Sequence, residues 1–335
     1  MKKYKLAIVG ATGLVGLSVL KVLEEKNIPI EKYVLLASSK SAGKSVTFKG
    51  KEYKVQELTK NSFDEGFDYA IFSAGGSISK EFAPIAVSKG CIVIDNSSYF
   101  RMDNDVPLVV PEVNFEDALQ NKGIIANPNC STIQAMLPLK ALDDKYKIKR
   151  VVYSTYQAVS GAGKAALDDL KLTKVSDNKD LKKFPYQIFD NCIPHIDSFT
   201  ENGYTKEELK MINETRKILH KPNLKVTATT VRVPVSNSHS ESINIEFEND
   251  FDINELRETL SNFENILVVD DPSTTSYPMA INATGHDEVF VGRIRRDFSV
   301  DYGINIWVVA DNIRKGAATN AVQIMEKLIN YDKEN

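Results

Sequence analysis

The first 25 residues combine a short apolar segment, three glycines and a helix-forming segment. Residues 5–9 read Lys-Leu-Ala-Ile-Val, which is typical of a strand buried on both faces of a sheet. Residues 10–16 read Gly-Ala-Thr-Gly-Leu-Val-Gly, and the apolar residues of 17–25 suit a helix packed on that sheet. Strand, glycine turn and helix in this order indicate a doubly wound α/β fold whose turn approaches a pyrophosphate. Because the spacing is G-x-x-G-x-x-G rather than G-x-G-x-x-G, a plain strand-to-helix turn stays open.

Further segments of the same kind follow this turn. The apolar stretches 33–37, 69–73 and 91–95 are predicted strands, and residues 80–89 favour a helix. Alternating strands and helices indicate a parallel sheet, in which ligands bind at the carboxyl ends of the strands. Two segments at those ends are candidate ligand contacts: one contains Gly75, and the other contains Arg101, whose guanidinium is well shaped to hold a phosphate. A surface arginine without such a role is the alternative for Arg101.

The segment after the second predicted strand bears on the choice of dinucleotide. An NAD site usually has Asp or Glu there for the ribose 2′-OH. This chain has hydroxyls and lysines instead, beginning with Ser38, Ser39 and Lys40. That chemistry suits a 2′-phosphate, so the sequence predicts NADP, with a solvated basic loop as the alternative.

A second motif, Asn-Pro-Asn-Cys-Ser-Thr at 127–132, precedes the apolar run 133–137. Pro128 is tolerated only near the first turn of a helix, and hydroxyl residues follow Cys130, so we expect this cysteine at a helix N-terminus. Unpaired backbone N–H groups and the helix macrodipole favour the thiolate there, and the thiolate is the nucleophilic form. The alternative is a small buried hydrophobe. Neighbouring amides and hydroxyls make a poor apolar niche, which favours a reactive cysteine.

Beyond this motif the chain becomes rich in β-forming residues, at 150–159, 225–235, 242–248 and 303–310. This pattern predicts a second, α+β domain with a mixed or antiparallel sheet. The fold class is therefore α/β, with an N-terminal Rossmann-type parallel sheet. We expect an NADP-binding domain at 1–127, a second domain at 128–312, and a final helix, 313–335, that packs back on the first.

Composition narrows the class of partner. Lys and Arg (42) nearly balance Asp and Glu (45), giving a net charge of −3, so nothing favours nucleic acid or an anionic membrane and a small-molecule partner is expected. The three cysteines, Cys91, Cys130 and Cys192, lack metal-ligand spacing, so no metal is predicted, and they fit a reducing cytoplasm. Glycines interrupt the apolar stretch 6–20, and a secretion signal is not expected. No apolar run reaches membrane-spanning length.

Five motifs in one order identify a family. They are G-A-T-G-x-V-G at 10–16, S-S-x-x-R at 97–101, N-P-N-C-S-T at 127–132, Q-A-x-S-G-A-G at 157–163 and R-V-P-V-x-x-x-H at 232–239. Together they closely resemble bacterial aspartate-β-semialdehyde dehydrogenase, from about residue 5 to about residue 325. The resemblance implies a homodimeric, sometimes tetrameric, cytoplasmic enzyme. Its implied reaction is the NADPH-dependent reductive dephosphorylation of β-aspartyl phosphate to aspartate semialdehyde, on the route to lysine, threonine and methionine.

The resemblance also implies catalytic roles. Cys130 would be the nucleophile that forms a thioester, which then accepts a hydride from the nicotinamide. The thiohemiacetal must lose its hydroxyl proton to collapse, which needs a base whose pKa lies near neutrality, and His239 matches the family's acid/base histidine. Gln157 would position the substrate. Without the family, structural roles are the better reading of the histidine and the glutamine.

Substrate and cofactor contacts follow from the same motifs. Arg232 would hold the α-carboxylate. In the helix predicted to begin at the capping-box pattern Thr205–Glu208, Glu214 would take the ammonium, and Lys217 would join Arg101 and Asn129 on the phosphate. A solvated salt bridge is the alternative for Glu214 and Lys217. The implied cofactor contacts are Gly10, Thr12, Gly13, Leu14, Val15, Ser38, Ser39, Gly75, Ser160, Gly161 and Asn312.

Three rival functions differ in the residues they need. N-acetyl-glutamyl-phosphate reductase shares the early glycine turn but needs no glutamate for a free ammonium, so Glu214 discriminates against it. Glyceraldehyde-3-phosphate dehydrogenase usually has an acidic residue after the second strand, which is missing here. A non-catalytic NADP-binding sensor would have little reason to retain both Cys130 and His239.

Overall fold

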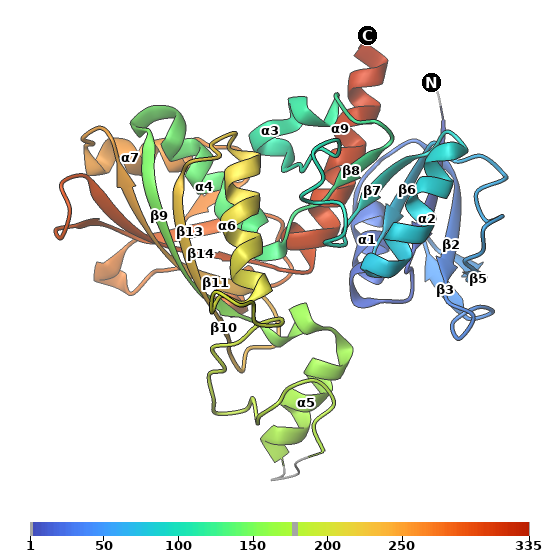
Figure 1. The fold of residues 1–335 in the computed structure, drawn as a ribbon, viewed down its shortest axis with the longest axis horizontal. Coiled ribbons are helices and arrows are strands. Elements are labelled where there is room, and N and C mark those ends of the chain that lie inside the picture. The colour runs from blue at the N-terminus through green and yellow to red at the C-terminus, as the bar shows by residue number, and fades with distance from the viewer. Residues whose placement is uncertain (1–2, 176–179, 335) are drawn as a thin grey trace. The chain divides into compact units, whose positions relative to one another are not determined.

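The computed structural model describes residues 3–175 and 180–334 (Figure 1). The chain divides into two compact units. Unit 1 consists of Met1–Asn129 and Ala317–Asn335, and unit 2 of Cys130–Gly316. No helix within the described residues has both the length and the apolar character to cross a membrane.

Unit 1 is built on a six-stranded parallel sheet, which confirms the predicted fold class (Figure 1). Its strands, in spatial order, are β5 (Gln56–Glu57), β2 (Ile30–Ala37), β1 (Tyr4–Val9), β6 (Tyr69–Phe72), β7 (Ile92–Asp95) and β8 (Ile124–Ala126). Its helices are α1 (Leu14–Glu25), α2 (Gly76–Ser88), α3 (Pro111–Ala118) and α9 (Asn320–Glu334). Central β1 is almost wholly buried, as its apolar sequence predicts.

The C-terminal helix α9 shares the core of unit 1. Its buried residues Val322, Met325 and Ile329 belong to the same apolar cluster as Leu6 and Leu23 of the N-terminal strand and helix. The helix differs from the predicted one at its start, because Arg314–Thr319 forms a π-helical segment, η3, before α9 begins. The small hairpin of β3 (Ser45–Phe48) and β4 (Lys51–Lys54) was not predicted, since its strands are short and mostly exposed.

Unit 2 contains the predicted mixed sheet, also of six strands (Figure 1). Their spatial order is β10 (Lys225–Arg232), β9 (Ile148–Gln157), β11 (His239–Phe247), β14 (Gly303–Ala310), β13 (Val289–Asp297) and β12 (Ile266–Val268). The helices α4 (Cys130–Tyr146), α6 (Lys206–Ile218) and α7 (Ile253–Ser261) pack on one face of this sheet. The remaining short elements are η1 (Val159–Ala162), α5 (Lys164–Val175), η2 (Pro272–Thr274) and α8 (Ala280–Ala283).

Helix α6 begins as its sequence predicts. Thr205 Oγ1 accepts a hydrogen bond from the Glu208 N–H, and Glu208 Oε2 accepts one from the Thr205 N–H, which completes a capping box. Glu208 Oε1 also accepts a hydrogen bond from the Thr230 N–H of β10. The cap therefore fixes the helix start and its position on the sheet.

We expect Thr205→Ala to lower the free energy of unfolding by about 1 kcal/mol, because the buried cap would lose its acceptor. Urea unfolding followed by circular dichroism measures this. Thr259→Ala is the matched control, since Thr259 lies inside α7, where its exposed hydroxyl donates to the Glu255 carbonyl one turn earlier and accepts a long hydrogen bond from Lys145. Equal losses in the two variants would contradict the prediction.

Candidate active site

Cys130 is the first residue of α4, where the sequence predicted a helix N-terminus. Its Sγ lies 3.2 Å from His239 Nε2, and the thiol is not part of a disulfide. Gly316 lies close against it, because a Cβ built at that glycine would be 2.9 Å from Cys130 Cβ. Cys130 therefore has the imidazole of His239 on one side. On another side the backbone of Gly316 packs so closely against it that residue 316 has no room for a side chain.

His239 is the first residue of β11 and is fully buried. Its Nδ1 accepts a hydrogen bond of 2.9 Å from the backbone N–H of Ala158. A Cβ at Gly161 would lie 3.2 Å from the ring, so only glycine fits beside it without displacing the imidazole. Burial, and then the positive charge of Arg232, lower the pKa of His239 to about 3.

Arg232 and Gln157 end the neighbouring strands β10 and β9 and are paired in register. Both side chains are buried. Arg232 Nη1 donates to the Ala158 carbonyl, and Gln157 Nε2 donates to Glu207 Oε1 at 3.1 Å. Burial lowers the pKa of Arg232, while the charges of Glu207 and Cys130 oppose that shift. The structure thus gathers the predicted residues Cys130, His239, Gln157 and Arg232 into one cluster of unit 2.

Glu207, which sequence reasoning did not select, belongs to this cluster. It is buried, it bonds Gln157, and its charge affects the pKa of both Arg232 and His239. Lys210 Nζ, one turn along α6, bonds Glu207 Oε2 at 3.1 Å. The sequence could have indicated Glu207, because Glu207 and Lys210 have the same three-residue spacing as Glu214 and Lys217 on the same helix.

Glu214 lies elsewhere along that helix. The next residue, Thr215, bonds Tyr153 Oη through its Oγ1 at 2.8 Å, and Tyr153 lies four residues before Gln157 on β9. Four residues of strand span about 13 Å, and the seven residues from Glu207 to Glu214 span about 10 Å of helix. Glu207, about two helical turns before Glu214, is therefore the glutamate of α6 that bonds Gln157.

Three predicted cofactor residues of unit 2 lie together beside the histidine. Ser160 Oγ accepts a hydrogen bond of 3.0 Å from Asn312 Nδ2, and Asn312 Oδ1 accepts one from the Ser238 N–H at 2.9 Å. Ser160 and Gly161 belong to η1, which directly follows Ala158. These bonds hold η1 and the residues before β11 in a fixed arrangement.

The predicted cofactor residues of unit 1 lie in loops at the carboxyl ends of adjacent strands. Gly10 follows β1 with φ +85°, and a Cβ there would lie 2.8 Å from the Ser73 carbonyl group, so only glycine fits. Gly13 is the N-cap of α1, and Leu14 and Val15 begin that helix. The other members, Thr12, Ser38, Ser39 and Gly75, are exposed or half-exposed. A glycine turn before exposed N–H groups at a helix start fits a pyrophosphate.

Arg101 and Asn129 are buried residues of unit 1. Arg101 Nε donates to the Asn127 carbonyl at 2.9 Å, and its Nη2 donates to the Asn96 carbonyl at 3.1 Å. Arg101 is therefore held in place by backbone and is not a freely moving surface side chain. Across residues 3–175 and 180–334, no three His, Cys, Asp or Glu side chains come close enough together to hold a metal ion.

Two family models and a sequence relative match most of this chain. Residues 5–121 match the family model described as semialdehyde dehydrogenase, NAD binding domain, and residues 139–315 match semialdehyde dehydrogenase, dimerisation domain. The aspartate-semialdehyde dehydrogenase of Aquifex aeolicus is 59% identical over 333 residues, which cover 97% of this chain and 98% of that protein.

Two solved structures extend the comparison. Aspartate semialdehyde dehydrogenase II from Vibrio cholerae, complexed with ASA, has a TM-score of 0.93 at 46% identity and covers 98% of this chain and 99% of its own. The enzyme from Candida albicans with NADP has a TM-score of 0.78 at 27% identity, covering 97% and 98% of the two chains. This chain belongs to the aspartate-semialdehyde dehydrogenase family.

Proposed function

We propose that this chain catalyses the NADPH-dependent reductive dephosphorylation of aspartyl 4-phosphate to aspartate 4-semialdehyde in amino-acid biosynthesis. The observation that carries the proposal is the separation of 3.2 Å between Cys130 Sγ and His239 Nε2 at the start of α4. A thiolate in this position can attack the acyl carbon, expel phosphate and hold the product as a thioester. When bound, NADPH supplies the hydride that reduces this thioester.

The substrate contacts are proposed from the same cluster. Arg232 would hold the α-carboxylate through paired hydrogen bonds, and Gln157 would position the acyl group near the sulfur. Glu207 takes the ammonium in place of Glu214, since it is the carboxylate that lies beside Gln157. Lys210, which bonds Glu207, takes the place of Lys217 as a phosphate contact.

The remaining roles rest on the resemblance and on the fit within unit 1. Arg101 and Asn129 stay candidates for the phosphate. The glycine turn at Gly10, with the exposed Ser38 and Ser39, would hold NADPH by its pyrophosphate and 2′-phosphate. Cys91, Cys130 and Cys192 form no disulfide in the structure, which fits a reducing compartment such as the cytoplasm.

The test is phosphate-dependent reduction of NADP⁺ with two aldehydes, aspartate semialdehyde and N-acetylglutamate semialdehyde. We expect turnover with the first only, because Glu207 offers a charge partner for the free ammonium that the second lacks. Turnover with the second would support the reductase alternative, and no turnover with either would support a non-catalytic sensor.

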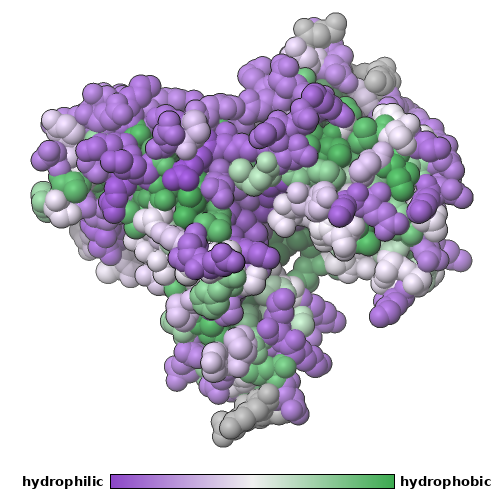
Figure 2. Space-filling model, in the orientation of Figure 1, coloured by the Kyte–Doolittle hydropathy of each residue, from purple (hydrophilic) through white to green (hydrophobic). Residues whose placement is uncertain are grey.

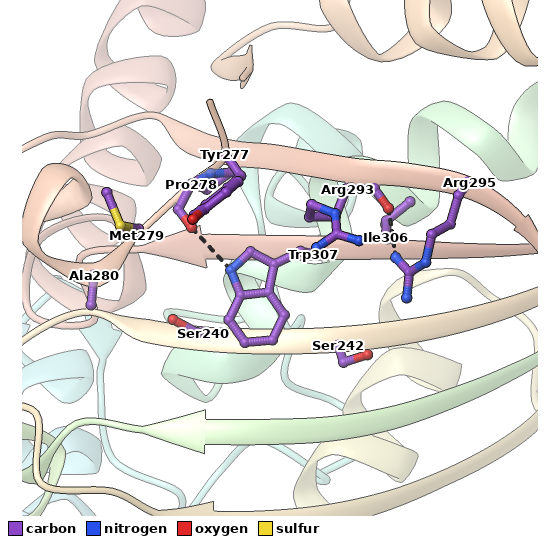
Figure 3. Close-up of a pocket in the computed structure, with 10 residues that line it drawn as sticks. All are labelled: Ser240, Ser242, Tyr277, Pro278, Met279, Ala280, Arg293, Arg295, Ile306 and Trp307. Atoms are coloured by element: carbon purple, nitrogen blue, oxygen red, sulfur yellow. Dashed lines mark hydrogen bonds between the residues drawn. The ribbon is translucent and has the colours of Figure 1, made fainter. Parts of the chain in front are cut away.

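We also propose that the chain forms a homodimer through the sheet face of unit 2 that faces away from α4. Hydrophilic residues cover much of the surface seen in Figure 2. The sheet face of unit 2 that faces away from α4 differs, because it combines exposed aromatic side chains such as Tyr156 with polar ones. A cavity of about 400 Å³ opens on it, with Trp307 at its centre and Arg293 and Arg295 at one side (Figure 3). Trp307 Nε1 donates to the Pro278 carbonyl, and its ring lies 5.4 Å from that of Tyr156.

We expect Met279→Arg to convert the dimer to monomers. Met279 lines this cavity and is 44% exposed, so the change should leave the single chain folded. It would add a third arginine to a cavity lining that already contains Arg293 and Arg295, and a two-fold interface would bring both sets of positive charges together. Light scattering after size-exclusion chromatography measures the mass and also separates dimer from tetramer. Tyr331→Arg, on the exposed side of α9, is the control. An unchanged mass in both variants would show that the interface lies on another surface.

A further inference from the structure

Glu241 is the third residue of β11, and its side chain is fully buried. Its neighbours in the strand, Ser240 and Ser242, line the cavity around Trp307 (Figure 3). Because successive side chains of a strand point to opposite faces, Glu241 lies on the other face of the sheet, where α4 and α6 pack. Glu241 therefore shares a sheet face with the active-site cluster, two residues after His239.

The carboxyl group of Glu241 has no hydrogen-bond partner. Neither of its oxygens bonds another residue within 3–175 and 180–334. Two further oxygens on the surrounding elements are also buried and without a partner in those ranges, Gln134 Oε1 on α4 and Thr230 Oγ1 on β10. An ionised carboxylate here would have neither a cation nor a hydrogen-bond donor bonded to it, so the neutral acid is favoured.

The charges near Glu241 favour the same form. Lys210 Nζ bonds Glu207 Oε2, and Arg232 Nη1 donates to a backbone carbonyl, so both nearby cations have other partners. Burial, and then the negative charge of Glu207, raise the pKa of Glu241 well above its ordinary range. The titratable and charged groups in the first two turns of α4 and α6, and beside Glu241 in the sheet, are Cys130, Lys206, Glu207, Glu208, Lys210, Tyr153, Arg232 and His239.

Glu241 is aligned with the residue that holds Gln157. In the register of the sheet it lies directly opposite Thr155 of β9, and the Cβ atoms of such a pair are about 4.5–5.5 Å apart. Thr155 Oγ1 donates its one proton to Gln157 Oε1 at 3.0 Å, and Gln157 Nε2 donates to Glu207 Oε1 at 3.1 Å. The Thr155 hydroxyl can still accept a hydrogen bond, and a protonated Glu241 is the donor opposite it. An ionised Glu241 could only accept, and it would compete with Gln157 for the Thr155 proton.

We propose that Glu241 is a positioning residue, which stays a neutral acid during turnover and donates to the Thr155 hydroxyl so that this hydroxyl holds Gln157. The proposal rests on the proposed function, in which Gln157 positions the acyl group and Glu207 binds the ammonium. The two side chains opposite each other are not bonded in the structure, and one bond between them would give both a partner. The two buried acids then divide the work: Glu207 carries the charge, and Glu241 carries the proton.

Turnover of four variants tests the connection through Thr155. Glu241→Leu and Thr155→Val each remove the proposed bond, so we expect kcat to fall about tenfold in each with little change in KM for aspartate semialdehyde. The double variant should be no slower than Thr155→Val alone, because both changes break one connection. Glu241→Gln is neutral and can donate, so it should turn over at least about threefold faster than Glu241→Leu. Losses that multiply in the double variant, or a glutamine variant as slow as the leucine variant, would overturn the proposal.

The same substitution at the other acid tests the division of charge and proton. Glu207→Gln removes the charge that binds the ammonium, so we expect KM for aspartate semialdehyde to rise about tenfold or more. Glu241→Gln removes no charge if Glu241 is neutral, and its KM should rise far less. An equal rise in KM in the two variants would show that Glu241 is ionised and would overturn the proposal.

Infrared spectroscopy of the whole protein tests the proton directly. A protonated carboxyl group absorbs at a higher frequency than a carboxylate, and ordinary carboxyl groups are ionised at about pH 8. We expect the unmodified protein to show a protonated-carboxyl band at this pH that shifts with ¹³C-labelled glutamate and is lost in Glu241→Gln and in Glu241→Leu. Absence of such a band would overturn the proposal, whatever the turnover. Absence of turnover in the unmodified protein would instead reject the proposed function, while the infrared band would still decide whether Glu241 holds a proton.

Discussion

Replacing Cys130 with alanine is expected to reduce phosphate-dependent reduction of NADP⁺ by about 10³-fold or more, while the affinity for NADPH stays nearly unchanged. The loss is large because, in the direction assayed, the aldehyde must first add to the sulfur and phosphate must then cleave the resulting thioester, and neither adduct can form without the sulfur. The affinity persists because the glycine turn at Gly10 belongs to unit 1, whereas Cys130 belongs to unit 2. Alanine fits the site, since it removes only the sulfur beside Gly316.

Two measurements check this prediction: steady-state turnover with aspartate semialdehyde, and a fluorescence titration with NADPH. Cys192→Ala is the matched control, because that thiol is free and exposed but lies outside the cluster. We expect this control to turn over normally and to show that loss of a cysteine alone is harmless. Activity near the unmodified level in Cys130→Ala would reject the thioester mechanism.

The sequence predicted most of the fold because its patterns are local. The apolar run of β1 and the glycine turn that begins at Gly10 are each recognised from five to seven adjacent residues, and the parallel sheet follows from alternating strands and helices. Strands β12 and β13 were missed. The first has three residues, and the second contains Gly292 and three arginines, which weaken any strand pattern. Gly292 is required there, because a Cβ would lie 2.2 Å from the Val269 carbonyl oxygen.

The candidate site was predicted less completely, because two of its features depend on contacts between distant segments. The choice between Glu207 and Glu214 depends on which turn of α6 lies beside the end of β9, and both residues have a lysine three positions later. The orientation of the His239 ring depends on a hydrogen bond to Nδ1 from the backbone N–H of Ala158, 81 residues earlier in the chain. A motif fixes residue types, but the pairing of β9 with β11 decides which backbone group reaches the imidazole.

Replacing Arg232 with lysine is expected to raise KM for aspartate semialdehyde about ten- to a hundredfold, with a smaller change in kcat. A guanidinium holds a carboxylate through two parallel hydrogen bonds, whereas an ammonium is a point charge. Loss of one charge-assisted hydrogen bond costs about 1.5–3 kcal/mol, which corresponds to this range. Arg232 is buried and ends β10 beside Gln157, so the lysine would stand among the same residues of the cluster.

The split between KM and kcat separates two roles of Arg232. If it binds the α-carboxylate, KM for the semialdehyde rises while KM for phosphate, which acts at the other end of the substrate, stays constant. If its main role is the bond from Nη1 to the Ala158 carbonyl, the variant would disturb the loop that positions His239, and kcat would fall instead. Arg150→Lys is the control, since Arg150 lies on β9 seven residues before Gln157 and its Nη1 donates to Asn244 Oδ1 at 3.4 Å. An unchanged KM for the semialdehyde would place the carboxylate site on other residues.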